Sequence, residues 1–261
     1  MPIAGIAGMD AAQSLTVTAC KVCGCPSPLF GVVDFHKSCV EAQGRRLSLS
    51  GIPVYYRRCT TCRFVFTDAF DTWSQEAFLE HIYNQDYIVV DPDFVEVRPS
   101  LNARAIASAF EASRSAIHIL DYGGGNGRMA ELLREQGFSA TTYDPFSIHN
   151  QLPSCRFDLI TCLEVAEHAP FPAQMIASMT SLLEEDGAIL FSTLLQPVDF
   201  DALGLNWWYA GPRNGHVSLY TAEALARLFA VHKMRVSSIS DGLHFAYRSV
   251  PAFATHLNLR T

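Results

Sequence analysis

A glycine-rich turn between an apolar run and an amphipathic segment constrains this chain more than any other feature. Residues 117–122 read Ile-His-Ile-Leu-Asp-Tyr, which predicts a buried strand, and the next five residues are Gly-Gly-Gly-Asn-Gly. Residues 128–136 then carry Met129, Leu132 and Leu133 at helical spacing. Glycine removes the Cβ and permits positive φ, so a ligand can approach the backbone and the free amides at the start of the helix. The sequence therefore predicts a strand, a ligand-binding turn and a helix.

The spacing of the glycines distinguishes between two kinds of cofactor loop. The dinucleotide fingerprint Gly-x-Gly-x-x-Gly would need a small residue three places after Gly125, and Arg128 stands there. The chain instead spells Asp-x-Gly-x-Gly-x-Gly through Asp121, Gly123, Gly125 and Gly127. This string resembles the first motif of class I S-adenosylmethionine (SAM) methyltransferases, whose loop wraps the methionine and ribose part of the cofactor. The resemblance implies that these four residues bind SAM.

The resemblance continues along the chain. A second predicted strand, residues 140–143, ends on Asp144, where a carboxylate can accept both ribose hydroxyls. A third apolar run ends at Cys162 and is followed by residues 164–168, Glu-Val-Ala-Glu-His, which resemble a signature of small-molecule methyltransferases. Cys162 and Glu164 are therefore implied as further cofactor contacts. The alternative is a tight turn and a solvated strand end without a ligand.

These elements together predict the fold class. We expect an α/β, Rossmann-like, mostly parallel sheet of seven strands, or six, closed by an antiparallel C-terminal hairpin around Asp241-Gly242. Only twelve residues separate Asp144 from Phe157, too few for the usual helix and strand. The third strand of the family fold is therefore predicted to be vestigial, which leaves the adenine contact unassigned.

Two Cys-x-x-Cys pairs in the amino-terminal part indicate a small zinc-ribbon-like module. The predicted ligands are Cys20, Cys23, Cys59 and Cys62, because four thiolates satisfy a tetrahedral structural Zn²⁺ and metal binding stabilises a segment with little core. Cys25 is a possible replacement ligand, and buried free thiols remain the alternative. Disulfides are disfavoured in a chain that reads as cytoplasmic.

The predicted organisation has four parts: a flexible tail (1–15), the zinc-binding module (16–70), a helical linker or lid (71–110) and the SAM-dependent methyltransferase domain (111–261). In related methyltransferases a tyrosine upstream of the glycine motif often lies over the cofactor. This makes Tyr87 a candidate cofactor contact, with a core or interface aromatic as the alternative.

Methyl transfer to an oxygen, nitrogen or activated carbon needs a base or an equivalent environment. His168 ends the Glu-rich motif, and Glu167 beside it would orient it or raise its pKa. His216 lies in the loop 207–220, where the family inserts substrate contacts, and residues 207–209, Trp-Trp-Tyr, would wall an acceptor pocket. We favour His216 as the base with His168 assisting. Either histidine as a hydrogen-bonded scaffold residue stays open.

Charge and composition limit the classes of binding partner that we expect. The net charge of −7 argues against a bulk nucleic-acid partner, although five arginines near the cysteines would meet phosphates or form a solvated face: Arg45, Arg46, Arg57, Arg58 and Arg63. No apolar run approaches membrane-spanning length and residues 1–15 lack the basic start of a signal sequence, so we expect a cytoplasmic protein without a membrane partner. A homodimer is left open.

A cysteine module ahead of a SAM domain resembles bacterial methyltransferases that act on nucleotide-linked sugars or on polysaccharide and natural-product precursors. The resemblance implies an enzyme that methylates a small, sugar-like acceptor and releases S-adenosylhomocysteine. Two alternatives remain: a zinc-ribbon RNA methyltransferase, whose affinity would fall steeply with salt, and a non-catalytic SAM-binding scaffold.

Overall fold

The computed structural model describes residues 16–259, so the predicted tail at residues 1–15 lies outside the described residues. The chain forms two compact units. Unit 1 consists of residues up to 92, 167–173 and 194–228, and unit 2 of residues 93–166, 174–193 and 229 onward. The chain therefore passes from one unit to the other five times. The four-part organisation predicted from the sequence stays a prediction.

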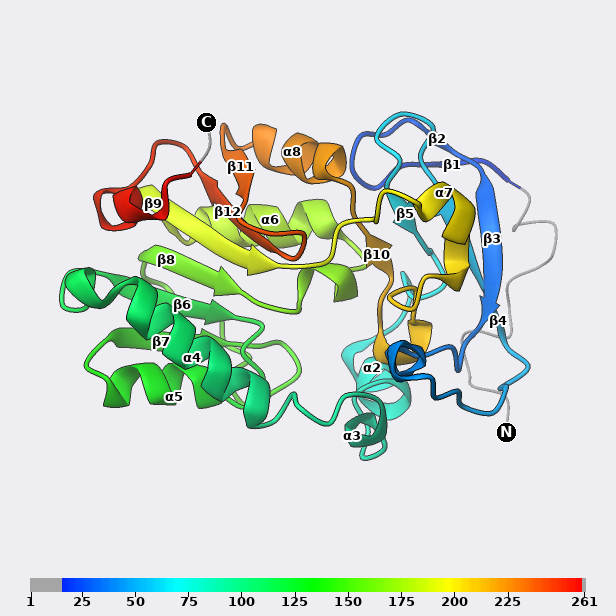
Figure 1. The fold of residues 1–261 in the computed structure, drawn as a ribbon, viewed down its shortest axis with the longest axis horizontal. Coiled ribbons are helices and arrows are strands. Elements are labelled where there is room, and N and C mark those ends of the chain that lie inside the picture. The colour runs from blue at the N-terminus through cyan, green and yellow to red at the C-terminus, as the bar shows by residue number, and fades with distance from the viewer. Residues whose placement is uncertain (1–15, 260–261) are drawn as a thin grey trace. The chain divides into compact units, whose positions relative to one another are not determined.

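Unit 2 is built on a six-stranded sheet in the order β11-β12-β9-β8-β6-β7. Its strands are β6 (His118–Tyr122), β7 (Ser139–Tyr143), β8 (Phe157–Cys162), β9 (Leu183–Ser192), β11 (Arg235–Ser238) and β12 (Leu243–Tyr247). The pairs β7–β6, β6–β8 and β8–β9 are parallel, and β9–β12 and β12–β11 are antiparallel (Figure 1). This confirms the mostly parallel α/β fold, in its six-stranded form, with its C-terminal hairpin.

The missing seventh strand follows from the short segment after Asp144. The twelve residues from 145 to 156 form no strand, and β7 pairs only with β6. Consequently β7 is an edge strand of this sheet.

Helices flank the sheet of unit 2 and bury its apolar residues. The core includes Ile119 and Leu159 from the sheet and Leu133 from α5, each fully buried. The helices within the unit are α4 (Val97–Ala109), η2 (Glu111–Ser113), α5 (Arg128–Glu135) and η6 (Ala252–Leu257). Helix α5 begins where the sequence predicts, directly after the last glycine of the turn.

Unit 1 contains a four-stranded antiparallel sheet in the order β10-β5-β4-β3, with a separate β1–β2 ribbon. Its strands are β1 (Thr18–Ala19), β2 (Pro26–Ser27), β3 (Leu29–Asp34), β4 (Pro53–Arg58), β5 (Val65–Phe66) and β10 (Ser218–Leu219). Its helices are η1 (Cys39–Gln43), α2 (Gln75–His81), α3 (Tyr87–Val90), α7 (Phe200–Leu203), η4 (Gly204–Asn206) and η5 (Pro212–Asn214). The late strand β10 thus completes a sheet begun by the cysteine-rich segment.

Three of the five points where the chain changes unit lie within helices: η3 (Ala166–His168), α6 (Pro172–Ser181) and α8 (Ala222–Ala230). Across residues 16–259, none of the helices combines the length and the apolar character that a membrane crossing requires.

Candidate functional site

The glycine turn of unit 2 has the backbone that its sequence predicts. Strand β6 ends at Tyr122 and α5 begins at Arg128. Between them Gly123, Gly125 and Gly127 have φ of +79°, +57° and +83°. Side chains disfavour this left-handed region, which explains why glycine recurs at alternate positions.

Two of these glycines are also required by close packing, and one faces open space. A Cβ at Gly123 would lie 2.4 Å from a methyl carbon of Val165, and one at Gly127 would lie 2.9 Å from Nε2 of His149. At Gly125 no atom of residues 16–259, apart from the two chain neighbours, lies within 4 Å of that position. The turn therefore presents bare backbone at Gly125, where a ligand can approach it.

Asp121, the acid that opens the motif, is buried beneath the turn. It is 3% exposed, and its Oδ2 lies 2.2 Å from the place where a Cβ of Gly124 would stand. Thr161 donates a long hydrogen bond to Oδ1 at 3.5 Å, while Oδ2 has no hydrogen-bond partner within the described residues. Burial, and then the charge of Asp144, raise the pKa of Asp121 to about 7.

Asp144 follows β7 and closes the other side of the turn. Its Oδ2 accepts from the Gly125 amide at 2.9 Å and its Oδ1 from the Phe146 amide at 2.7 Å. Burial raises the pKa of this carboxyl, against the lowering effect of the two amides. Each oxygen keeps a second lone pair, so the carboxylate can still accept hydroxyl donors.

The end of β8 carries the other predicted cofactor residues. Cys162 is fully buried at the last position of the strand. Glu164 adopts φ +56°, which is unusual for a residue other than glycine. The Ser192 hydroxyl accepts from the Glu164 amide at 2.7 Å and donates to its Oε1 at 2.6 Å. Sequence analysis missed Ser192, since no motif marks it.

Tyr87 belongs to unit 1, whereas the glycine turn belongs to unit 2. Its side chain is 5% exposed, its ring packs edge-on against Tyr83, and its hydroxyl donates to the Asn214 carbonyl at 3.4 Å. These contacts fit the alternative of a core aromatic, and its role toward the cofactor stays a prediction.

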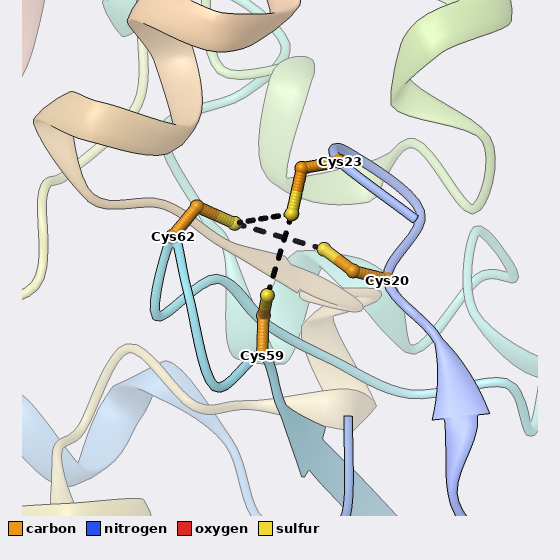
Figure 2. Close-up of side chains that lie close together, drawn as sticks. All are labelled: Cys20, Cys23, Cys59 and Cys62. Atoms are coloured by element: carbon orange, nitrogen blue, oxygen red, sulfur yellow. Dashed lines mark hydrogen bonds between the residues drawn. The ribbon is translucent and has the colours of Figure 1, made fainter. Parts of the chain in front are cut away.

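The four predicted metal-binding cysteines converge in unit 1. Their sulfur atoms all lie within 4.8 Å of one another (Figure 2). The Sγ atoms are 3.6 Å apart for Cys20 and Cys62, 3.4 Å for Cys23 and Cys59, and 3.6 Å for Cys23 and Cys62. A tetrahedral zinc with Zn–S bonds of about 2.3 Å requires sulfur atoms about 3.8 Å apart. The arrangement therefore fits zinc.

Both Cys-x-x-Cys pairs lie in turns of the same design. The Cys20 amide donates to the Cys25 carbonyl at 2.8 Å, and the Cys59 amide donates to the Phe64 carbonyl at 2.9 Å. The residue after each pair is left-handed: Gly24 has φ +73° and Arg63 has φ +59°. In each turn one more backbone amide donates to the sulfur of the first cysteine of the pair at 3.4 Å. Such a hydrogen bond stabilises a thiolate.

Cys20 and Cys62 change each other's acidity. A hydrogen bond from Cys62 lowers the pKa of Cys20 to about 5, and the same bond raises the pKa of Cys62. Cys25 lies outside the group, so Cys20 rather than Cys25 provides the fourth sulfur.

The predicted catalytic residues also come together, and all three belong to unit 1. Glu167, His168 and His216 each place a nitrogen or oxygen atom within 4.8 Å of the others. The two imidazole rings meet edge-on with centroids 4.9 Å apart. Gly215 makes this possible, because a Cβ there would lie 3.0 Å from Nδ1 of His168.

The surroundings of His216 fix which ring nitrogen can act as a base. Its Nδ1 lies 2.8 Å from the Tyr209 carbonyl oxygen, which can only accept, so the proton sits on Nδ1. The Cys39 sulfur lies 3.5 Å from the same nitrogen. The lone pair of the neutral ring is therefore on Nε2. The side chain is 6% exposed, a setting that limits access of water.

Three of the five clustered arginines are paired with carboxylates, whereas Arg45 and Arg46 are exposed. Arg57 is 1% exposed and donates to Asp68 at 2.9 Å. Arg58 donates to Asp201 at 2.6 Å, and Arg63 binds the same carboxylate. Sequence alone could not pair these charges, because Asp201 lies far along the chain.

The predicted aromatic wall borders a cavity within unit 1. Trp207 and Trp208 line it together with Glu41, Arg46 and Asn206, and its volume is about 450 Å³. An aromatic ring beside carboxylate, amide and guanidinium groups suits a polar ring-shaped ligand. Tyr209 does not line this cavity but is buried beside His216, with ring centroids 4.2 Å apart.

Comparison with known proteins bears on unit 2 most directly. The family model described as Methyltransferase domain matches residues 94–232. The ubiquinone biosynthesis O-methyltransferase of Coxiella burnetii (strain RSA 493 / Nine Mile phase I) is 31% identical over 101 residues, which cover 30% of this chain and 43% of the relative. That of Actinobacillus pleuropneumoniae serotype 5b (strain L20) is 42% identical over 60 residues, 22% of this chain and 25% of the relative. The chain thus spans less than half the length of these relatives.

Solved structures give weaker likenesses. The magnesium protoporphyrin IX methyltransferase of Synechocystis PCC 6803 with bound S-adenosylhomocysteine covers 60% of this chain and 86% of its own, at 14% identity and a TM-score of 0.44. An O-methyltransferase family protein from Burkholderia thailandensis covers 69% and 64%, at 12% identity and a TM-score of 0.46.

Proposed function

The chain belongs to the Methyltransferase domain family, and from that premise we propose that it transfers a methyl group from SAM to a small-molecule acceptor. The observation that carries this proposal is the glycine turn. It combines open backbone at Gly125 with two carboxyls, of Asp121 and Asp144, in the family-matched part of the chain. The ribose hydroxyls would donate to Asp144, and the buried Asp121 would favour a cationic ligand.

When bound, SAM supplies an electrophilic methyl group on a sulfonium and leaves as S-adenosylhomocysteine. His216 would take the proton of the acceptor hydroxyl at Nε2. The Tyr209 carbonyl keeps the ring in the tautomer that this step needs. Glu167 would stabilise the imidazolium that results, because its carboxylate lies within 4.8 Å of a nitrogen of each histidine.

We favour a sugar-like acceptor. The cavity beside Trp208 offers an aromatic face together with the Glu41 carboxylate, which suits a ring carrying several hydroxyls. The Coxiella and Actinobacillus relatives are named for ubiquinone biosynthesis. A hydroxylated aromatic ring is therefore the second acceptor class to test.

The cysteine group would hold one structural Zn²⁺, because four thiolates in this geometry satisfy the metal fully and leave no position for a substrate. Its contribution would be to stability. The RNA methyltransferase alternative is less favoured, since Arg57, Arg58 and Arg63 are paired with carboxylates and only Arg45 and Arg46 of the cluster are exposed.

Native mass spectrometry of the purified chain with and without SAM tests the cofactor, and the same spectra weigh the metal. Turnover is tested by S-adenosylhomocysteine release with a panel of nucleotide-linked hexoses and 1,2-dihydroxybenzenes. Binding without turnover on any acceptor would favour the scaffold alternative, and no binding would refute the methyltransferase proposal.

Gly125→Asp provides a site-specific test of the cofactor site. Aspartate tolerates left-handed φ, and apart from the chain neighbours no atom of the described residues lies within 4 Å of the new Cβ, so the chain should fold while the side chain fills the ligand's space. We expect SAM affinity to fall at least about 100-fold, or about 2.7 kcal/mol, by calorimetry. Gly51→Asp is the matched control, because Gly51 has φ +76° and is equally open. Unchanged affinity in Gly125→Asp would place the cofactor elsewhere.

A further inference from the structure

The loop that carries His216 is held on both sides by the cysteine-rich segment of unit 1. The Tyr56 hydroxyl donates to the His216 carbonyl at 2.6 Å, and the Thr67 amide donates to the Val217 carbonyl at 3.0 Å. Strand β10, which starts one residue later at Ser218, pairs with β5. The backbone from 216 onward is thus an extension of the sheet that begins in the cysteine-rich segment.

On the preceding side, Asn214 connects the loop to two other segments. Its Oδ1 accepts from the Ser38 hydroxyl and from the Cys39 amide, both at 2.8 Å. Its Nδ2 donates to the Val90 carbonyl at 3.2 Å. The side chain is 3% exposed, and these bonds satisfy most of its capacity. The loop is therefore fixed immediately before His216 as well as after it.

Tyr56 is the contact made to His216 itself. It lies on β4, three residues before the cluster residue Cys59, and is fully buried. Burial raises its pKa far above the usual tyrosine range, so the hydroxyl stays protonated and donates at every working pH. Strand β4, which leads on to Cys59, therefore fixes the position of the His216 main chain relative to the sheet.

We propose that Tyr56 is a positioning residue for the base, and that the cysteine module serves catalysis by holding the His216 loop in register with the sheet. The inference rests on the proposed role of His216. A carbonyl held at 2.6 Å fixes the main chain of the histidine, while the Tyr209 carbonyl at 2.8 Å from Nδ1 fixes its ring. Loss of the Tyr56 hydrogen bond would let the main chain of His216 shift relative to the Tyr209 carbonyl.

The test compares Tyr56→Phe with Tyr55→Phe in the full-length chain. Both changes remove one hydroxyl from β4, and the Tyr55 hydroxyl has no hydrogen-bond partner in the described part of the chain. With ¹⁵N-labelled histidine, the His216 resonances are assigned by their loss in His216→Ala. We expect the wild type and Tyr55→Phe to show one tautomer, protonated at Nδ1, and Tyr56→Phe to show a mixture. This readout needs no acceptor.

Turnover gives the second readout, with the best acceptor of the panel above. A displaced catalytic group can cost up to about 100-fold in rate. We expect Tyr56→Phe to lower kcat about 10- to 100-fold with an unchanged KM for SAM. In the His216→Ala background the same change should cost nothing further, because Tyr56 acts through His216.

The outcomes separate this inference from the proposed function. Equal losses from Tyr56→Phe in both backgrounds, or an unchanged His216 spectrum, would overturn the positioning role. Full activity of His216→Ala would overturn the base itself. If no acceptor turns over, the spectra alone decide whether Tyr56 positions the ring.

Discussion

Asp121→Asn should stabilise the protein, and more so at higher pH. The wild-type carboxyl has a pKa of about 7 in the folded chain against an ordinary value of 3.8, because it is buried and faces Asp144. The folded state therefore binds more protons than the unfolded state between these two values, and stability falls as pH rises through that window. Asparagine has nearly the same shape and cannot ionise.

The magnitude follows from the two pKa values. At about 1.36 kcal/mol per unit, the wild-type carboxyl costs about 1.6 kcal/mol at pH 5 and about 4.3 kcal/mol at pH 8, where the effect has levelled off. The stability gained by Asp121→Asn should thus be about 2.7 kcal/mol larger at pH 8 than at pH 5.

Urea unfolding followed by circular dichroism at both pH values measures this difference. Asp186→Asn is the control, because Asp186 is exposed and the exchange of groups is identical. A gain for Asp121→Asn that is the same at pH 5 and pH 8 would refute the reasoning, since it would mean that Asp121 has the same pKa in both states.

Two further changes test the sites of unit 1. Cys59→Ser should abolish binding of one zinc per chain and lower Tm by about 10 °C, because about 3 kcal/mol of stability is lost. Elemental analysis measures the zinc and calorimetry measures Tm, with Cys155→Ser, which changes an exposed free thiol, as the control. An unchanged Tm in Cys59→Ser would count against a metal. Gly215→Ala should lower the free energy of unfolding in urea by about 2–3 kcal/mol, because φ is +87° and the methyl group would lie 3.0 Å from His168. Gly44→Ala, at a glycine with φ +72° and open space around it, should lower it by only about 1–2 kcal/mol. Equal losses would contradict the packing argument.

The parts of the fold that sequence predicted are those encoded locally. The turn from Gly123 to Gly127 depends on residues next to one another, and so do the hairpin of β11 and β12 and the absence of a strand between Asp144 and Phe157. The two cysteine turns repeat one local pattern, so their chemistry could be inferred before their geometry was known. In each case a short stretch of chain contains both the signal and the structure that it specifies.

The contacts that sequence analysis missed join distant segments. Ser192 and Glu164 are 28 residues apart, and Tyr56 and His216 are 160 apart. The local sequence around a serine or tyrosine in a strand does not indicate its hydrogen-bond partner, because the order of the strands decides which residues meet. The pairing of Arg58 with Asp201 escaped prediction for the same reason.

The repeated passage of the chain between its two units limits how this protein can be divided. A fragment that starts at residue 93 would keep every strand of the large sheet, but would also carry residues 167–173 and 194–228 without the sheet that β10 completes. A fragment that ends at residue 92 would lack that strand altogether. No single cut in the chain therefore separates the two units, so a truncation or fusion at any one point divides at least one of them.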